Sequence, residues 1–196
     1  MKKYHPPLCN EYQDRIKIGS LPGFAKAAVV NRFLARYRLA RAFRGLDLEG
    51  YSPNTLAGYN ALTGLSLHWS AFEQFKKALK IESADGLLNK YPTDECLSMI
   101  KSLDPYFTFF TFVQDHLTGK SQKIELERFI LSGEGSPLLL SKTIRHIFFH
   151  GPLTPNAKGV DPLIVQQICD CLSDFIINFI DAEFENNVNK LLVFYP

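Results

Sequence analysis

An arginine and two histidines lie close together in residues 141–151, whose sequence is SKTIRHIFFHG. His146 directly follows Arg145, and His150 comes four residues later. Arginine stays protonated and presents a planar fork of donors that suits a phosphate, and histidine takes or gives a proton near neutral pH. These residue types suffice for metal-free cleavage of RNA, because the ribose 2′-hydroxyl supplies the nucleophile and the arginine stabilises the charge that grows on the phosphate.

The spacing of Arg145 and His150 separates them on an ideal helix. Five residues turn the helix by about 500°, which leaves about 140° between the two side chains. They converge only if the helix ends or loosens at Phe149 and His150, where the following Gly151 and Pro152 allow it, or if two chains pool their sites across a dimer. In the alternative interpretation, Arg145 is a structural ion-pair partner and His150 caps the C-terminal end of the helix dipole.

His146 and His150 also share a helix face, and this spacing suits two zinc ligands. No glutamate follows His146 as it does in the HExxH motif, and only Asp161 or His68 can be proposed as a third ligand. We therefore expect no metal and no other cofactor.

The composition places limits on the class of protein. The chain has 196 residues, of which 46% are hydrophobic and 21% charged, so we expect a soluble globular protein. A net charge of +2 excludes a polycation, and any nucleic-acid contact must come from a local patch. The polar N-terminus does not resemble a signal peptide, no apolar run reaches roughly 18 residues, and the four cysteines lack metal spacing. These features predict a cytoplasmic protein with reduced cysteines and no membrane contact.

Hydrophobic periodicity predicts an all-α fold. Residues 1–19 are expected to form an extended N-terminal arm because Pro6 and Pro7 oppose a helix, and residues 20–196 a single helical domain. Helices are predicted over residues 22–43, 54–81, 96–102, 105–117, 121–131, 137–150 and 161–189, with Ser20, Pro105 and Ser136 at helix starts. No alternating strand is found, so the architecture is an antiparallel bundle of four to five principal helices with short accessory helices.

Two of these helices carry charged residues that could support the site. The helix over residues 54–81 has one apolar stripe, in which Glu73 is either an edge glutamate that reaches water or the partner of Arg145. The helix over residues 22–43 carries arginines around more than half of its circumference. This surface is either a solvated face or a phosphate-binding one, which makes Arg32 and Arg36 candidate substrate-binding residues. The apolar stripe of the helix over residues 54–81 consists of Leu62, Leu65, Trp69, Phe72, Phe75 and Leu79.

The sequence RHIFFHG of residues 145–151 resembles the signature of HEPN domains, an all-α superfamily. That signature is an arginine, usually a polar residue, three or more variable residues, and a histidine that is often followed by glycine. Here His146 fills the polar position. The motif lies late in the chain before a loop and a long final helix, as in the family, and residues 69–73 are loosely similar to the acidic position of the family.

The resemblance implies a HEPN-like bundle and a metal-independent endoribonuclease that acts as a homodimer in a toxin–antitoxin, phage-defence or RNA-processing system. Arg145 would stabilise the scissile phosphate, His150 would be the acid–base group, and His146 would assist. The implied partners are RNA, a second copy of the chain, and an antitoxin or other protein. One HEPN branch has a modified tyrosine two residues after the histidine, where this chain has Pro152. Some members lack nuclease activity, so the alternative is a non-catalytic nucleotide-, RNA- or protein-binding module.

Overall fold

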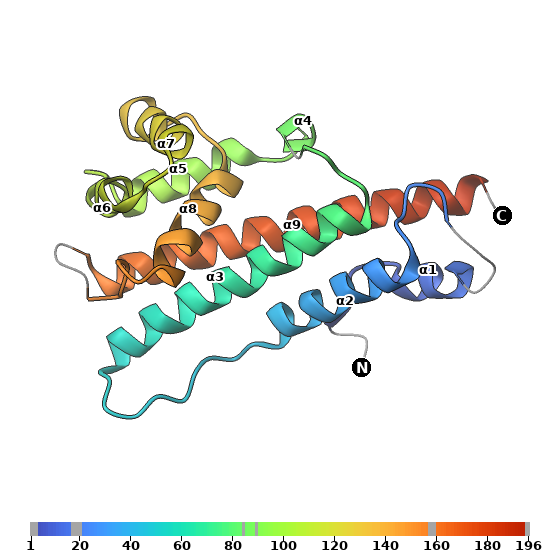
Figure 1. The fold of residues 1–196 in the computed structure, drawn as a ribbon, viewed down its shortest axis with the longest axis horizontal. Helices are drawn as coiled ribbons and strands as arrows, with labels where there is room; N and C mark the ends of the chain where they lie inside the picture. Colours follow the sequence, from blue (N-terminus) through green and yellow to red (C-terminus); the bar gives the residue numbers. More distant parts are fainter. Residues whose placement is uncertain (1–3, 17–20, 84, 89, 157–159, 195–196) are drawn as a thin grey trace. The chain divides into compact units, whose positions relative to one another are not determined.

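The computed structural model describes residues 4–16, 21–83, 85–88, 90–156 and 160–194, and these residues are 73% helical with no strand (Figure 1). The all-α prediction is therefore confirmed. In chain order the described helices are α1 (Cys9–Ile16), α2 (Ala27–Ala42), α3 (Pro53–Ala78), α4 (Asp85–Leu88), α5 (Thr93–Leu103), α6 (Thr108–His116), α7 (Lys120–Ser132), α8 (Pro137–Phe149) and α9 (Pro162–Phe194).

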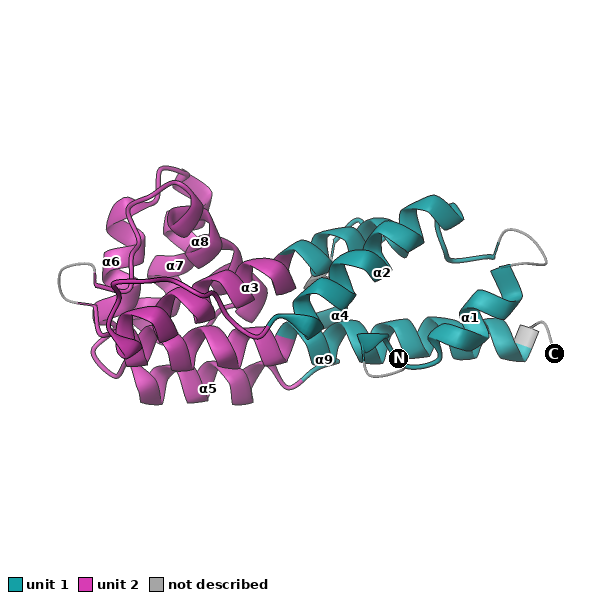
Figure 2. Cartoon of the chain, turned by 90° about the horizontal axis from the view of Figure 1, so that it is seen from below, with its two compact units in different colours: residues 1–43, 70–91, 176–196 teal, residues 44–69, 92–175 magenta. Residues whose placement is uncertain are grey.

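The chain forms two compact units, each assembled from separate stretches of sequence (Figure 2). Unit 1 contains Met1–Phe43, Ser70–Tyr91 and Ile176–Pro196, and unit 2 contains Arg44–Trp69 and Pro92–Phe175. The predicted boundary between residues 19 and 20 falls inside unit 1 and does not separate the units. That residues 20–196 make a single domain stays a prediction.

The prediction of an extended N-terminal arm is wrong for Cys9–Ile16, which form α1. Pro6 and Pro7 oppose a helix only at their own positions, so a helix can begin directly after them. The backbone N–H of Cys9, the first residue of α1, bonds to the carbonyl of Pro6. The Tyr12 ring packs 4.9 Å from Phe24 and 5.8 Å from Phe184. This burial stabilises a helix that is too short to be stable alone.

Aromatic rings fill the core of unit 1. The fully buried Phe33 ring lies 5.9 Å from Tyr37, 5.4 Å from Phe75 and 5.8 Å from Phe184. The predicted α2 began too early, at residue 22, because Gly23 adopts a left-handed turn with φ of 79°. The predicted cap Ser20 lies outside the described residues. The arginines of α2 are exposed, as expected.

Helix starts in unit 2 depend on side-chain contacts that the sequence did not predict. The Asp104 carboxylate accepts backbone N–H bonds from Thr108, Phe109 and Phe110, so α6 begins at Thr108 and not at Pro105. α8 begins at Pro137 as predicted, although the Ser136 side chain makes no capping bond. All six residues predicted for the apolar stripe of α3 and its C-terminal flank are buried.

The expectation that no segment is long and apolar enough for a membrane span is wrong for α9. The helix over Pro162–Val193 includes an 18-residue window with mean hydropathy of 1.5. However, 56% of that window is buried inside the protein, and the core helices of soluble proteins pass the same test. Its buried side chains include Val165, Ile168 and Leu172 of unit 2. The burial is that of a core helix.

Candidate functional site

α8 separates a buried face from a cationic one. Leu140, Ile144 and Ile147 are at most 1% exposed, and the buried Ser141 and Thr143 hydroxyls donate to carbonyls of their own helix. The opposite face, which we call the α8 face, is exposed or half-buried, and no Asp or Glu occurs anywhere in residues 137–156. At about 100° per residue its side chains span an arc of about 140°, with Arg145 at one edge and His150 at the other. The α8 face consists of Arg145, Phe149, Lys142, His146 and His150, in this order around the helix.

The C-terminal end of α8 is well formed. The N–H of His150 still bonds to the carbonyl of His146 at 3.1 Å, and those of Gly151 and Leu153 bond to the carbonyls of Phe148 and Ile147. α8 ends at Phe149 with His150 as its C-cap residue, and Gly151 follows with a φ of 96° that suits glycine. The helix thus ends where one of the two alternatives requires, and the convergence of Arg145 and His150 within one chain stays a prediction.

The structure pairs the side chains of this face with neighbours one turn away. The rings of His146 and His150 lie 4.4 Å apart between centroids, at an interplanar angle of 53°. The Arg145 guanidinium carbon lies 5.2 Å from the centroid of Phe149. Both contacts join residues four apart, which face each other on a helix. One chain thus brings the two histidines together and holds the arginine on an aromatic ring.

The surroundings of His146 favour its uncharged form. Loss of hydration lowers the pKa of His146, and the positive charges of His150, Arg145 and Lys142 lower it further. Because the ordinary pKa of histidine is near 6.5, this imidazole is mostly neutral at pH 7. A neutral imidazole has one ring nitrogen that can accept a proton.

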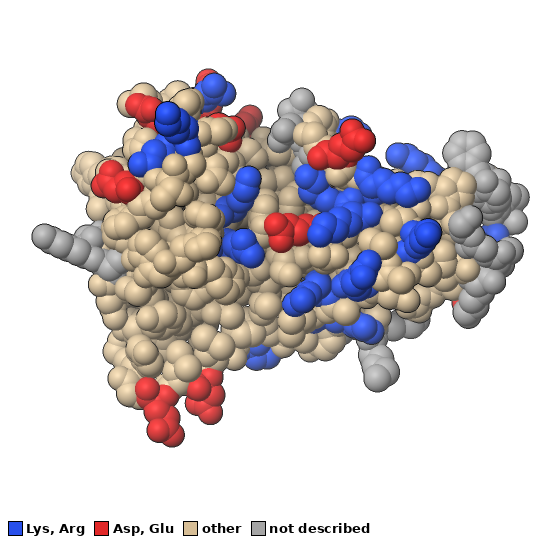
Figure 3. Space-filling view, viewed as in Figure 1, with Lys and Arg blue, Asp and Glu red and all other residues tan. Residues whose placement is uncertain are grey.

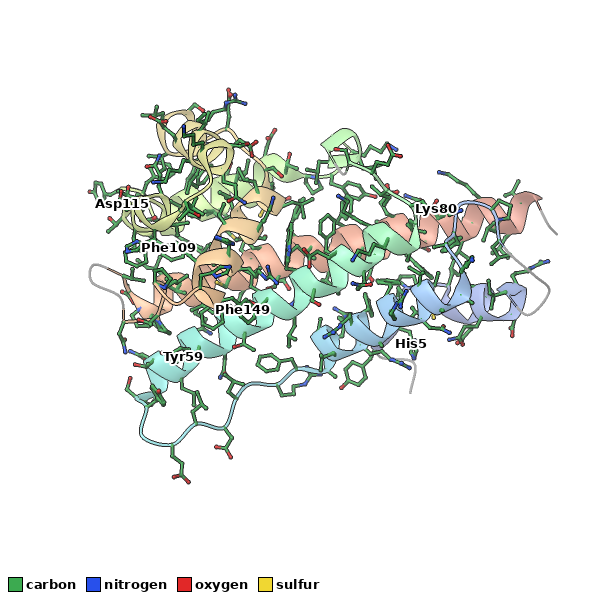
Figure 4. The ribbon with its side chains drawn as sticks, viewed as in Figure 1. His5, Tyr59, Lys80, Phe109, Asp115 and Phe149 are labelled. Carbon is green, nitrogen blue, oxygen red and sulfur yellow. The ribbon has the colours of Figure 1, made fainter. Side chains whose placement is uncertain are left out.

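Aromatic side chains continue from the α8 face onto the start of α3. The ring of Tyr51 lies 5.4 Å from Tyr59, Tyr59 lies 6.5 Å from Phe148, and Phe148 lies 5.5 Å from Phe149. We call these four rings the aromatic row; Figure 4 labels two of them, Tyr59 and Phe149. Tyr51 is 50% exposed and Phe149 62% exposed, so both ends are open to solvent. The sequence analysis missed Tyr59, because only tertiary packing brings it beside Phe148.

The loop that follows His150 is held against α3. A Cβ atom on Gly58 would lie 2.6 Å from the Cβ of Pro155, so only glycine allows this approach. The Asn156 amide donates to the Thr55 hydroxyl at 2.9 Å. These contacts position the loop directly after the site, and the sequence analysis identified none of them.

The remaining predicted site residues belong to unit 1. Glu73 is exposed, which agrees with an edge glutamate that reaches water, and its pairing with Arg145 of unit 2 stays a prediction. Arg32 and Arg36 line a shallow pocket together with Leu39 and Gln74.

 The volume of this pocket is about 400 Å³. Figure 3 shows basic side chains gathered over α2 and the C-terminal end of α3, which is consistent with either a solvated face or a phosphate-binding surface.

The described residues do not complete a metal site around the histidine pair. Nowhere in the described part of the chain do three His, Cys, Asp or Glu side chains come together in a group that could hold a metal ion. His68, one proposed third ligand, bonds through Nδ1 to the carbonyl of Gly64 at 2.8 Å. Asp161, the other, accepts the backbone N–H of Leu163 at the start of α9.

Comparisons of this chain with protein-family models, with curated proteins and with solved structures found no match. The resemblance to HEPN domains therefore depends on seven residues and on the all-helical architecture.

Proposed function

We propose that the α8 face binds single-stranded RNA and that a homodimer of this chain cleaves the RNA without a metal ion, as endoribonucleases of HEPN type do. The observation that carries the proposal is the contact between the tilted rings of His146 and His150 on a partly exposed face of a helix without Asp or Glu, a face that also holds Arg145. We include in the proposal a HEPN-like antiparallel bundle, a cytoplasmic location, and an antitoxin or other protein partner in a toxin or defence system.

Each side chain has a role that its surroundings support. Arg145 stabilises the negative charge on the phosphate, and the exposed His150 exchanges protons with the RNA. The imidazole removes the proton of the 2′-hydroxyl, the 2′-oxygen bonds to phosphorus, and the bond to the 5′-oxygen breaks. The leaving oxygen then receives a proton, which gives a 2′,3′-cyclic phosphate and a 5′-hydroxyl. The neutral His146 orients His150 through the ring contact.

The geometry of α8 favours a site that two chains share. Arg145 and His150 lie at opposite edges of the α8 face, and the N–H of His150 keeps its helical bond to the carbonyl of His146. In a symmetric dimer the same face of each chain meets its copy, so the arginine of one protomer can approach the histidine of the other. In such a dimer the arginine and the histidine of one site come from different chains, so Arg145 and His150 of one chain can stay about 140° apart around α8.

The aromatic row supports a single-stranded substrate. Bases stack on exposed aromatic rings only when they are not paired within a duplex, and such stacking tolerates any sequence. Phe149 presents an exposed ring whose neighbour Arg145 carries the phosphate-binding charge. A strand can therefore place bases on the row while its backbone passes Arg145.

The proposal is tested by mixing two inactive variants. We expect the purified chain to cleave single-stranded RNA in EDTA, and Arg145→Ala or His150→Ala to lower the rate by roughly 10²–10⁴-fold. After subunit exchange, an equimolar mixture of the two variants forms heterodimers in half of the dimers, each with one complete shared site. The mixture should recover roughly a quarter of the wild-type rate.

Arg128→Ala on α7 removes an exposed arginine of the same unit and is the matched control. It should keep the full rate. A mixture that stays inactive although the two variants exchange subunits would contradict the shared site, and full activity in either single variant would contradict catalysis by these residues.

One observation favours a second function, a non-catalytic RNA- or nucleotide-binding module. The Arg145 guanidinium lies on the Phe149 ring, a contact that suits binding of a base and a phosphate without a reaction. This alternative predicts that the wild-type chain binds RNA without cleaving it and that His150→Ala binds RNA as well as wild type does.

A further inference from the structure

Two cysteines of unit 2 lie in contact although they are far apart in the sequence. Cys96 is in the first turn of α5 and Cys171 is in the first third of α9, and their Sγ atoms are 3.5 Å apart. The Sγ of Cys171 also lies 3.9 Å from the carbonyl of Cys96. The chain holds no disulfide at these cysteines, since all four cysteines are free thiols.

The two sulfurs differ in exposure and in ionisation. Cys96 is 8% exposed, whereas Cys171 is half-buried. A hydrogen bond from the Cys96 thiol lowers the pKa of Cys171, and the same bond together with burial raises the pKa of Cys96. The thiolate therefore forms on the less buried of the two residues, which favours reaction with an oxidant.

We propose that Cys96 and Cys171 are a thiol pair that peroxides oxidise to an intramolecular disulfide, which links α5 to α9 within unit 2. The proposal stands on the contact between the two sulfurs and is independent of RNA cleavage. It adds a covalent modification site to the chain.

The reaction balances with hydrogen peroxide as the oxidant. The Cys171 thiolate attacks one peroxide oxygen, the O–O bond breaks, and Cys171 becomes a sulfenic acid while the other oxygen leaves as water after protonation. The Cys96 sulfur then attacks the Cys171 sulfur, the S–O bond breaks, and a second water leaves. Two thiols and one peroxide give one disulfide and two waters.

The geometry selects this pair among the four cysteines. Closing the gap from 3.5 Å to the roughly 2.05 Å of a disulfide requires a movement that side-chain rotation can supply. Cys169 precedes Cys171 by two residues, so it points about 200° away around α9 and is fully buried. Cys9 belongs to unit 1 and lies beside His5.

The test is oxidation of the folded, full-length chain with hydrogen peroxide, followed by unfolding, alkylation of the remaining thiols and peptide mass spectrometry. We expect a loss of about 2 Da and one cross-linked peptide pair that contains Cys96 and Cys171. Cys9 and Cys169 should be alkylated. The disulfide closes a loop between residues 75 apart, so the melting temperature should rise by about 5–10 °C and return to its starting value after reduction.

Cys96→Ser and Cys171→Ser distinguish the cysteine that reacts with peroxide from the cysteine that then attacks the sulfenic acid. Cys96→Ser should leave a sulfenic acid on Cys171 that dimedone traps, and Cys171→Ser should leave Cys96 unmodified. Cys169→Ala is the matched control and should still form the disulfide. Alkylation of both Cys96 and Cys171 after oxidation of the wild-type chain, or a cross-link between two chains in place of the internal one, would overturn the proposal.

Discussion

The core of unit 1 and the α8 face of unit 2 differ in the surroundings of their polar side chains. In unit 1 the Tyr37 hydroxyl donates to Asp181 at 2.5 Å and the Tyr91 hydroxyl donates to Glu183 at 2.6 Å. Each of these groups is satisfied inside the unit, among packed rings. On the α8 face the cations lie together in a segment without any carboxylate. The difference teaches that these core carboxylates of unit 1 are bonded within the fold, while the cations of the α8 face are available to a ligand.

The same comparison holds for phenylalanine. Phe33 is fully buried between three rings, while Phe149 is 62% exposed beneath a guanidinium. Burial of a ring stabilises the fold, and an exposed ring contributes little to it. The two residues therefore offer a direct way to separate stability from binding.

The largest effect is expected from this pair of rings. Phe33→Ala should lower the free energy of unfolding by about 3–5 kcal/mol, because it leaves a cavity in the core of unit 1. Phe149→Ala should change it by no more than about 0.5 kcal/mol but weaken single-stranded RNA binding by about 1–3 kcal/mol. Denaturant unfolding and RNA titration of both variants measure the two effects. Equal losses of stability would remove the distinction between the two regions.

A smaller effect is expected from Tyr37→Phe, which removes the donor to Asp181 and should cost about 1–3 kcal/mol at pH 7. Burial raises the pKa of Asp181 above its usual value, while the bond from Tyr37 lowers it. A raised carboxyl pKa adds stability at low pH that is lost as the pH rises through the folded-state pKa. Because the bond from Tyr37 favours the ionised carboxylate, which is less populated at low pH, the cost of Tyr37→Phe should be smaller at pH 4 than at pH 7.

Denaturant unfolding at the two pH values measures this dependence. Asp181→Asn removes the titrating group and is the control, so Tyr37→Phe in that background should cost the same at both pH values. A cost of Tyr37→Phe that is larger at pH 4 would show that the Tyr37 bond does not favour the ionised carboxylate of Asp181.

The smallest effect concerns the ionisation of His146. His150→Ala removes one of the positive charges that lower the pKa of His146, so that pKa should move up toward its usual value. Proton NMR titration of the imidazole resonances measures the change. Arg128→Ala, distant in the sequence and on α7, should leave the resonance unaffected. No change in either variant would show that desolvation alone lowers the pKa.

The helices were predictable to different degrees for a physical reason. α3 and α8 follow from apolar residues repeated every three or four positions, because the period of a helix is a local property. The helix α1 was missed and the start of α6 was misplaced. Their stabilising contacts, the rings around Tyr12 and the Asp104 carboxylate bonds, depend on packing or on turn geometry.

The sequence by itself determined that the chain is helical and that Arg145, His146 and His150 are its most chemically distinctive cluster, because residue type and short-range spacing are written along the chain. Only the tertiary structure decided that the histidine rings touch at a tilt while Arg145 lies over Phe149. It also decided that Tyr59 lies beside Phe148 and that Cys171 contacts Cys96. Contacts between residues far apart in sequence follow from how helices pack, and packing is a property of the whole chain and not of any one segment.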